Sequence, residues 1–334
     1  MPRLMRAVVL TGHGGPEQLV VRHDVPVPTA GPGEVLIRAS AAAVNNTDIN
    51  TRVGWYSGGG WTGSFTFPRI QGIDACGEVM AVGASVDGAR VGERVVVEPC
   101  WVDASGATVF LGSEVDGAFA EFVAVPSRIA HRVRSELSDV ELASFPCSWS
   151  TAENLLVRSG VGHGDRVLIT GASGGVGSAA VQLAAVRGAQ VTGVAAAGKH
   201  DALLALGAAR MIDRGESAIE AFGRDAFDVV IDVVGGDTWL ELLEVLRPGG
   251  RYATSGAIGG PLVALDLRTL YLKDLTLFGC TVLGPGVFAG LVQRIERGEV
   301  QPVVAAVFPL ERIGEAQALF ASKVHVGKIV LTLV

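Results

Sequence analysis

The sequence predicts an α/β protein with a doubly wound parallel sheet and a second, β-rich domain, and three observations support this. Residues 1–130 contain alternating apolar runs separated by turn clusters such as GHGGPE and TAGPGE, a pattern typical of β-strands. From about residue 129, apolar runs alternate with helical segments, which indicates βαβ units. The first of these runs enters a glycine-rich turn, TGASGGVG, at 170–177. We therefore expect a β-rich domain at 1–130 and 286–334, and a parallel-sheet domain at 131–285.

Each expected element follows from its own pattern. Short alternating runs bounded by turn residues predict the strands of the first domain, at 6–10, 19–24, 35–43, 77–82, 94–97 and 119–125. Apolar runs predict buried parallel strands, at 166–170, 190–194, 227–232, 251–255 and 275–282. Helical periodicity predicts helices near 178–187, 199–206, 238–246 and 287–297. The closing segment, 307–334, has the pattern of a helix followed by a strand and could rejoin the first domain.

The composition argues against several classes of protein. Hydrophobic residues make up 49% of the 334 residues and charged residues 18%, which is typical of a globular chain rather than a disordered one. A net charge of −7 without a concentrated Lys/Arg run argues against a nucleic-acid partner. No apolar stretch reaches the ~18 residues of a membrane span, and the first residues lack the pattern of a signal peptide. We expect a cytoplasmic protein with no membrane partner, whose four separated cysteines are buried free thiols.

The glycine-rich turn predicts a dinucleotide site. It lies between the apolar run at 167–169 and the helical pattern SAAVQLAAVRGA. Glycines let backbone N–H groups approach a diphosphate closely, and the start of the following helix adds partial positive charge. An ordinary turn would account for the glycines, but not for the strand–turn–helix context. The expected contacts are Gly171, Ala172, Ser173, Gly174, Gly175, Val176 and Gly177.

Six motifs follow one another along nearly the whole chain: GEVLIRASAAAVNNTD, QGIDACGEVMAVG, GERVVV, DGAFAEFVAVP, TGASGGVGSAAVQLA and HVGKIVLTL. Their order resembles the medium-chain dehydrogenase/reductase superfamily, and within it the zinc-independent quinone oxidoreductase branch. The resemblance implies a Rossmann dinucleotide-binding domain beside a GroES-like domain. It also implies hydride transfer between a nicotinamide cofactor and a substrate.

The sequence departs from the zinc alcohol dehydrogenases of that superfamily at their metal ligands. Those enzymes carry a cysteine after the strand corresponding to 35–43, and a Gly-His-Glu motif further on. Here the two stretches read Val-Asn-Asn-Thr-Asp at 44–48 and Gly-Ile-Asp at 72–74. The four-cysteine lobe of many relatives is also missing, since only Cys100 lies in that region. A zinc site with the usual nitrogen and sulfur ligands cannot be assembled there, so we expect no metal.

The end of the second parallel strand favours NADPH as the cofactor. An NAD-preferring site usually carries an acidic residue there, ~20 residues past the glycines, to bind the ribose 2′-hydroxyl. Here residues 190–194 run into Ala-Ala-Ala-Gly-Lys at 195–199, without an acid. Lys199 is a candidate partner of a 2′-phosphate. The alternative is that Lys199 is a solvated residue at the start of the next helix.

The resemblance implies further contacts with the cofactor. Asn45 would face the nicotinamide, Thr151 the phosphate or ribose, and Lys328 the adenosine phosphate. Small residues at strand ends would follow the cofactor, although plain packing also accounts for each of them. These are Val233, Val234, Gly235, Ser255, Gly256 and Ala257, with Thr281 and Val282 at the nicotinamide.

Without zinc to polarise a carbonyl, a quinone or an α,β-unsaturated carbonyl is the easier hydride acceptor, because negative charge delocalises onto a distant oxygen. Catalysis then depends on positioning and on hydrogen bonds to the developing enolate. Asn45 and Tyr56 are the candidate donors, although Tyr56 packed with its hydroxyl at the surface is an equal alternative. For Asp48 we favour a structural role, as an ion pair with Arg52 or a turn cap.

The loop SGGGWTGSFTFP combines flexible glycines with Trp61, Phe65 and Phe67. A mobile apolar lid over the substrate and local packing of the three aromatic rings are both compatible with this composition. A lid would imply a hydrophobic substrate.

The leading interpretation is an NADPH-dependent, zinc-independent oxidoreductase that transfers hydride to an apolar quinone or α,β-unsaturated carbonyl. Three alternatives stay open: an enoyl-thioester reductase of the same fold, a zinc-dependent alcohol dehydrogenase, and an NADPH-binding crystallin-like or regulatory protein with little turnover. Members of the superfamily commonly pair through the edge strand of the nucleotide domain. The apolar run at 275–282 suits such pairing, so we expect a homodimer.

Overall fold

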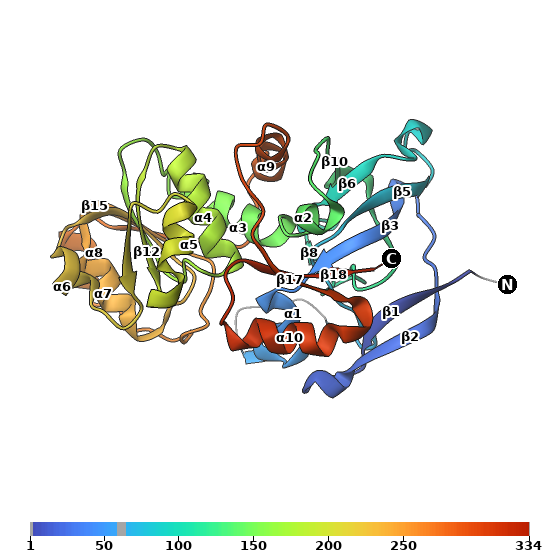
Figure 1. The fold of residues 1–334 in the computed structure, drawn as a ribbon, viewed down its shortest axis with the longest axis horizontal. Helices are drawn as coiled ribbons and strands as arrows, with labels where there is room; N and C mark the ends of the chain where they lie inside the picture. Colours follow the sequence, from blue (N-terminus) through green and yellow to red (C-terminus); the bar gives the residue numbers. More distant parts are fainter. Residues whose placement is uncertain (1–2, 59–64, 334) are drawn as a thin grey trace. The chain divides into compact units, whose positions relative to one another are not determined.

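A computed structural model describes residues 3–58 and 65–333. The chain divides into two compact units (Figure 1). Unit 1 contains Met1–Cys147 and Phe288–Val334, and unit 2 contains Ser148–Val287. Unit 1 thus continues past the expected boundary at 130, because the segment after it adds β10 and α2, which pack on strands of the same unit.

Unit 2 is built on a six-stranded sheet in the order β13-β12-β11-β14-β15-β16, and every neighbouring pair is parallel. This is the strand order of a dinucleotide-binding doubly wound fold, so the expected Rossmann architecture is confirmed. The strands are β11 (Arg166–Ile169), β12 (Gln190–Ala195), β13 (Arg210–Asp213), β14 (Phe227–Asp232), β15 (Leu246–Thr254) and β16 (Thr276–Gly279). The helices are α4 (Gly175–Val186), α5 (His200–Ala205), α6 (Ala218–Phe222), α7 (Trp239–Glu244) and α8 (Leu267–Leu272), with short 3₁₀ turns at Ala197–Lys199 and Gly236–Thr238.

Unit 1 is a mainly antiparallel β-structure with a seven-stranded sheet in the order β10-β6-β5-β3-β18-β17, on which β9 also pairs with β3. A three-stranded sheet, β2-β1-β4, and the hairpin β7-β8 accompany it. The strands are β1 (Leu4–Leu10), β2 (Leu19–Pro26), β3 (Glu34–Ala43), β4 (Arg69–Ile70), β5 (Cys76–Val82), β6 (Arg94–Val97), β7 (Cys100–Val102), β8 (Thr108–Phe110), β9 (Phe122–Pro126), β10 (Ala130–Arg132), β17 (Val304–Pro309) and β18 (Lys328–Thr332). The helices are α1 (Asn46–Arg52), α2 (Asp139–Ala143), α9 (Val287–Glu296) and α10 (Ile313–Ser322), with 3₁₀ turns at Pro16–Gln18, Trp55–Gly58, Gly88–Arg90, Ser127–Ile129 and Leu310–Arg312.

The boundary between the units falls inside a helix that the sequence pattern did not reveal, α3 (Pro146–Arg158). Short polar α1 was also missed, because its sequence NTDINTR has no apolar periodicity and depends on its cap at Asn45. At the sheet edge, β16 is shorter than the expected strand at 275–282.

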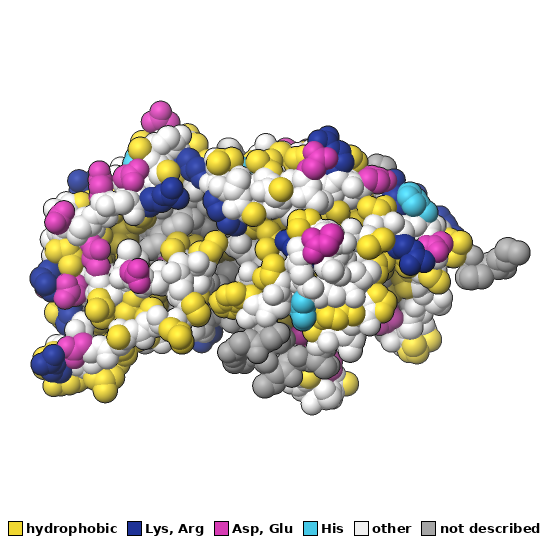
Figure 2. Space-filling model, turned by 90° about the horizontal axis from the view of Figure 1, so that it is seen from below, with side chains coloured by type: hydrophobic (Ala, Val, Ile, Leu, Met, Phe, Trp, Pro, Cys, Tyr) yellow, Lys and Arg dark blue, Asp and Glu magenta, His cyan; other side chains and the backbone are white. Residues whose placement is uncertain are grey.

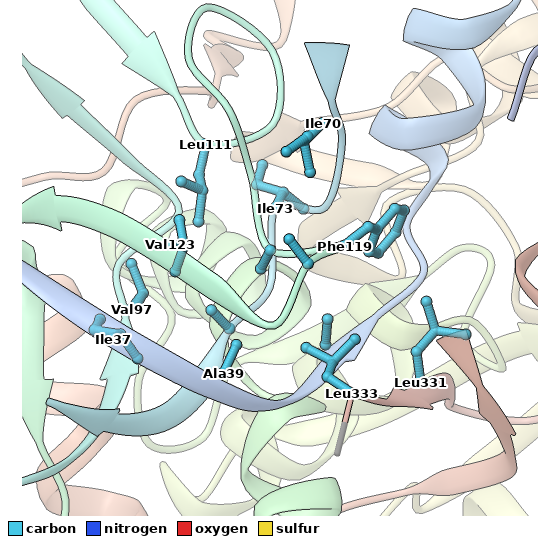
Figure 3. Packing of buried hydrophobic residues seen from close by; sticks show 14 of the residues in the cluster. Ile37, Ala39, Ile70, Ile73, Val97, Leu111, Phe119, Val123, Leu331 and Leu333 are labelled. Carbon is cyan, nitrogen blue, oxygen red and sulfur yellow. The ribbon is translucent and has the colours of Figure 1, made fainter. Parts of the chain in front are cut away.

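The C-terminal segment completes the β-structure that the N-terminal residues begin. Strand β18 pairs antiparallel with β3, and Figure 1 shows the red C-terminal strands beside the blue N-terminal ones. In the core of unit 1, Leu331 and Leu333 pack in one cluster with Ile37 and Phe119, all of them almost completely buried (Figure 3). This pairing brings Lys328, at the start of β18, to the end of β3, where the chain enters α1.

Across residues 3–58 and 65–333, no helix has both the length and the apolar character needed to cross a membrane. On the face shown in Figure 2, Lys and Arg side chains are interspersed with Asp and Glu. The four cysteines form no disulfides; Cys76, Cys100 and Cys280 are buried and Cys147 is half-buried.

Candidate functional site

The glycine turn of unit 2 has the backbone that a diphosphate site requires. Gly171, the second residue after β11, has φ +57°, and Gly174 caps the N-terminus of α4. A Cβ at Gly177 would lie 2.2 Å from the carbonyl oxygen of Gly171, so only glycine permits this close packing of helix on turn. The first N–H groups of a helix lack intrahelical acceptors, so the residues present fit the diphosphate of a dinucleotide.

Lys199 lies beside this turn. Its Nζ is 3.3 Å from Oγ of Ser173, which connects the end of the β12 segment to the glycine turn. Burial, and next the positive charge of Arg214, lower the pKa of Lys199. On the neighbouring strand β13, Asp213 pairs in register with Ala195 at the end of β12 and accepts a hydrogen bond from the N–H of Ala197 at 2.7 Å. Two cations and one carboxylate therefore surround this end of the sheet.

Two further groups of expected residues lie on loops at the same carboxyl edge. Val233 and Val234 follow β14, and Ser255, Gly256 and Ala257 follow β15; all are half-buried. The N–H of Gly259 donates to Val234 O at 2.7 Å, so the two loops are joined. The parallel sheet therefore brings together the glycine turn, Lys199 and both loops, which are far apart in the sequence.

The segment after β16 is held by a residue that the sequence reasoning missed. Thr281 and Val282 are exposed, and the side-chain N–H₂ of Asn154 donates to Val282 O at 3.1 Å. Asn154 also accepts a hydrogen bond from the N–H of Gly284 at 3.3 Å. Asn154 lies on α3, one turn after the half-buried Thr151. Both residues belong to unit 2.

Unit 1 holds a buried polar cluster at the entry to α1, formed by Asn45, Asp48, Asp74 and Lys328. Nζ of Lys328 donates to Oδ1 of Asn45 at 2.5 Å and to Oδ2 of Asp74 at 2.9 Å. The amide of Asn45 donates to the same oxygen of Asp74 at 2.8 Å, and the N–H of Cys147 donates to the other at 2.6 Å. Lys328 is 2% exposed and Asp74 0%. This is a buried, hydrogen-bonded ion pair between residues 254 positions apart.

Lys328 therefore lies inside unit 1, and its ammonium is engaged by two buried oxygens. These two bonds use two of the three hydrogens of the ammonium, and a contact with the adenosine phosphate stays a prediction. The side chain of Asn45 is hydrogen-bonded in the same way. Its N–H₂ group donates to Asp74 and to Ala43 O, and its oxygen accepts from Lys328. Its role as a donor to substrate is likewise untested, and would use a hydrogen that is already bonded.

Asp48 has the structural role expected for a cap rather than for an ion pair. Its Oδ2 accepts a hydrogen bond from the N–H of Asn45 at 2.8 Å, at the start of α1. Arg52 instead donates to Gly14 O and to Oε1 of Gln317. Burial raises the pKa of Asp48 to about 7. The hydrogen bond from Asn45 N–H lowers this pKa, and the negative charge of Asp74 raises it further. The folded protein thus holds a carboxyl group that titrates near neutrality.

Tyr56 lies after α1 in the turn Trp55–Gly58, half-buried, with its hydroxyl 3.5 Å from the side-chain nitrogen of Asn50. Burial raises the pKa of Tyr56, whereas hydrogen bonds with Asn50 and Thr47 lower it. The phenol therefore keeps its proton at neutral pH and can donate it.

The aromatic residues of the glycine-rich loop pack locally where they are described. Phe67 meets His13 edge-on at 4.8 Å between ring centroids, and Phe65 lies 4.9 Å from Phe67. The guanidinium of Arg69 lies 5.9 Å from the Phe65 ring. Trp61 lies outside the described residues. The function of Phe65 and Phe67 as a lid stays a prediction.

Within the described part of the chain, no three His, Cys, Asp or Glu side chains gather as metal ligands would. At the two stretches where zinc dehydrogenases carry ligands, this chain places an amide and a carboxylate, with an ammonium between them. An ammonium has no lone pair to offer and repels a metal ion. The residues present therefore do not fit a zinc ion at this position.

Comparison with known proteins gives matches along the whole chain. Residues 31–135 match the family described as "Alcohol dehydrogenase GroES-like domain", and residues 175–297 match "Zinc-binding dehydrogenase". The chain is 31% identical to the acryloyl-coenzyme A reductase of Metallosphaera sedula, over 98% of this chain and 100% of that protein. It is 30% identical to the quinone oxidoreductase of Lama guanicoe, over 99% of this chain and 98% of that protein. Among solved structures, a putative alcohol dehydrogenase from Sinorhizobium meliloti 1021 matches with a TM-score of 0.92 and 44% identity, over 100% of this chain and 98% of that one.

Proposed function

The chain is an oxidoreductase of the medium-chain dehydrogenase/reductase superfamily, quinone oxidoreductase-like, and on this premise we propose that it uses NADPH, without zinc, to reduce quinones or α,β-unsaturated carbonyl compounds. The proposed use of NADPH rests on the contact of Lys199 with the glycine turn. The proposed lack of zinc rests on the ion pair of Lys328 with Asp74. The acryloyl-coenzyme A reductase relative supports an enoyl thioester as a second candidate substrate.

The proposed phosphate site consists of Ser173, Lys199 and the neighbouring charge of Arg214. A 2′-phosphate is attracted by both cations, whereas an acid at the end of β12 would repel it. Asp213 is the competing feature, because a carboxylate near this strand end favours a ribose hydroxyl. Its contacts with the N–H groups of Ala197 and Gly215 direct its charge to the backbone, which is why we favour NADPH.

Kinetics with both cofactors test this choice. We expect kcat/KM to be higher with NADPH than with NADH, and comparable values would contradict the proposal. Lys199→Ala should raise KM for NADPH about tenfold, the equivalent of one charge-assisted hydrogen bond, and leave KM for NADH unchanged. Lys323→Ala is the matched control, because the ammonium of Lys323 contacts Asn46 in unit 1.

In the proposed mechanism the residues of the chain bind and orient the cofactor and protonate the substrate. The glycine turn holds the diphosphate, and Lys199 the 2′-phosphate. When bound, the reduced nicotinamide supplies the hydride for the electrophilic carbon of the substrate. Tyr56, which burial keeps protonated, donates a hydrogen bond or a proton to the enolate that develops.

A substrate screen and one substitution test the chemistry. NADPH consumption with 1,4-benzoquinone, methyl vinyl ketone and crotonyl-CoA, compared with simple alcohols and aldehydes, should favour the first three. Tyr56→Phe should lower kcat on an enone about a hundredfold if Tyr56 supplies the proton, and unchanged turnover removes it from the mechanism. Metal analysis of the purified protein should find no stoichiometric zinc. A protein that binds NADPH but oxidises it with none of these compounds would instead fit a binding or regulatory role.

We also propose a homodimer that pairs through β16. This strand is an edge of the six-stranded sheet, so one side of its backbone has no partner strand in the described chain. Exposed apolar side chains at Leu267, Tyr271 and Leu272 lie on the preceding helix α8. The mass of the particle in solution, measured by light scattering, distinguishes a dimer from a monomer.

A further inference from the structure

We propose that Asp232 is a positioning residue that holds the three cofactor-facing loops of unit 2 in one arrangement; this rests on the proposed use of a nicotinamide cofactor. Asp232 is the last residue of β14 and is 0% exposed. Among the described residues no cationic side chain forms an ion pair with it. Its charge is therefore stabilised by hydrogen bonds alone.

Four groups donate to the carboxylate: one from the residue after β11, two from the loop after β14 and one from β15. Oδ1 accepts from Oγ1 of Thr170 at 2.5 Å and from the N–H of Val234 at 2.9 Å. The N–H of Gly235 is 3.1 Å from both oxygens. The hydroxyl of Tyr252, in β15, donates to Oδ2.

These donors connect Asp232 to the expected cofactor contacts. Thr170 directly precedes Gly171 in the glycine turn, and Oγ1 of Thr170 also accepts from the N–H of Val233 at 3.1 Å. The two N–H bonds to Asp232 curl the Val233–Val234 loop back on the end of β14. Gly235 has φ +67° and bridges Gly260, so this loop in turn fixes the one after β15.

The chemistry of the position explains why an acid is present. A carboxylate only accepts hydrogen bonds, and its two oxygens have room for donors from several directions. An amide offers one accepting oxygen and turns its N–H₂ toward the other donors. Asp232 therefore satisfies a turn that would otherwise bury unpaired N–H groups beside the diphosphate site.

Substitutions on either side of the carboxylate separate positioning from general stability. Thr170→Val removes the donor next to the glycine turn, and Thr170→Ser keeps it. Tyr252→Phe removes the donor on the core side, where Tyr252 also packs edge-on against Trp239. Asp232→Asn keeps the size of the side chain and removes the charge.

The readouts are the Kd of NADPH, by calorimetry on the full chain, and the midpoint of thermal unfolding. We expect Thr170→Val and Asp232→Asn to raise Kd about tenfold, the equivalent of one lost hydrogen bond to a charged group. Thr170→Ser should restore binding to within about twofold. Tyr252→Phe should lower the unfolding midpoint while Kd changes by less than about threefold.

Two results would overturn the proposal. One is a Kd within about twofold of the unchanged protein in both Thr170→Val and Asp232→Asn. The other is a Tyr252→Phe protein that loses as much affinity as Thr170→Val, because Asp232 would then act only through stability. If the unchanged protein binds neither NADPH nor NADH, the proposed function itself fails, and that result is seen before any variant is compared.

Discussion

The two units stabilise a completely buried carboxylate in different ways. In unit 1, Asp74 is paired with the ammonium of Lys328 and also accepts from Asn45 and the N–H of Cys147. In unit 2, Asp232 has only hydroxyl and backbone donors. If either Asp74 or Lys328 is replaced by a neutral residue, the other is left as a buried charge without a counter-ion. Replacing Asp232 by a neutral residue leaves no such charge. Unit 1 therefore stabilises its buried carboxylate with an opposite charge, whereas unit 2 stabilises its own with the dipoles of hydroxyl and N–H groups.

The largest effect is expected for Lys328→Met. Methionine fills much of the lysine stem but leaves Asp74 charged and buried without its counter-ion, so the free energy of unfolding should fall by about 3–5 kcal/mol. Urea unfolding of the full chain measures the change. The double variant Lys328→Met/Asp74→Asn removes both charges and should recover more than half of the loss. Lys323→Met, five positions earlier at a surface contact, should cost less than about 1 kcal/mol. A loss below about 1 kcal/mol for Lys328→Met would show that the ion pair contributes little.

The second effect compares the two carboxylates directly. Asp74→Asn leaves the Lys328 ammonium buried and unpaired, whereas Asp232→Asn leaves no unpaired charge. We expect Asp74→Asn to cost about 3–5 kcal/mol and Asp232→Asn about 1–3 kcal/mol in the same urea series. Equal costs, or the reverse order, would mean that charge pairing is not what distinguishes the two units.

A pH-dependent effect should come from Asp48, the other carboxyl group of the unit 1 cluster. Burial raises its pKa from 3.8 to about 7, so between these values the folded chain holds a proton that the unfolded chain releases. Stability from this group is therefore complete below pH 3.8, falls as pH rises toward 7, and is lost above it. The slope should reach about 1.4 kcal/mol per pH unit at most. Asp48→Asn should flatten it, and an unchanged slope would assign it to other groups.

The smallest effect is expected for Tyr252→Phe. The substitution keeps the aromatic ring against Trp239 and removes one of the four donors to Asp232. Three donors remain and no charge is unpaired, so the cost should be about 1 kcal/mol, measured by urea unfolding. A cost as large as that of Lys328→Met would show that hydroxyl and backbone donors alone do not stabilise the carboxylate.

Much of the fold around the glycine turn could be predicted because its signals are local. A strand, a glycine turn and a helix follow one another at 166–186, and the missing acid lies at the end of the next strand. Asp232 was missed, although an acid at the end of the strand segment FDVVID is a signal that could have found it. Asn154 was missed because it lies on α3, which the sequence pattern did not reveal.

The unit 1 cluster could not be predicted in the same way. The sequence indicated that zinc ligands are missing at 44–48 and 72–74, but not what replaces them. The family resemblance implied a phosphate contact for Lys328, and an isolated lysine after a glycine carries no sign of a buried partner. The α1 cap at Asn45 was hidden for a similar reason, since a short polar helix has no apolar periodicity.

The sequence alone was enough for the order of elements, the parallel sheet, the glycine turn and the family, because these depend on periodicity and on residues close together in the chain. Only the tertiary structure showed that Lys328 pairs with Asp74 and Asn45, because this contact forms when β18 joins β3 in one sheet. It also showed that Thr170, Asp232 and Tyr252 meet, because parallel strands align their carboxyl ends whatever their separation in sequence. Buried polar groups find partners across the fold, and such partners leave no local pattern in the sequence.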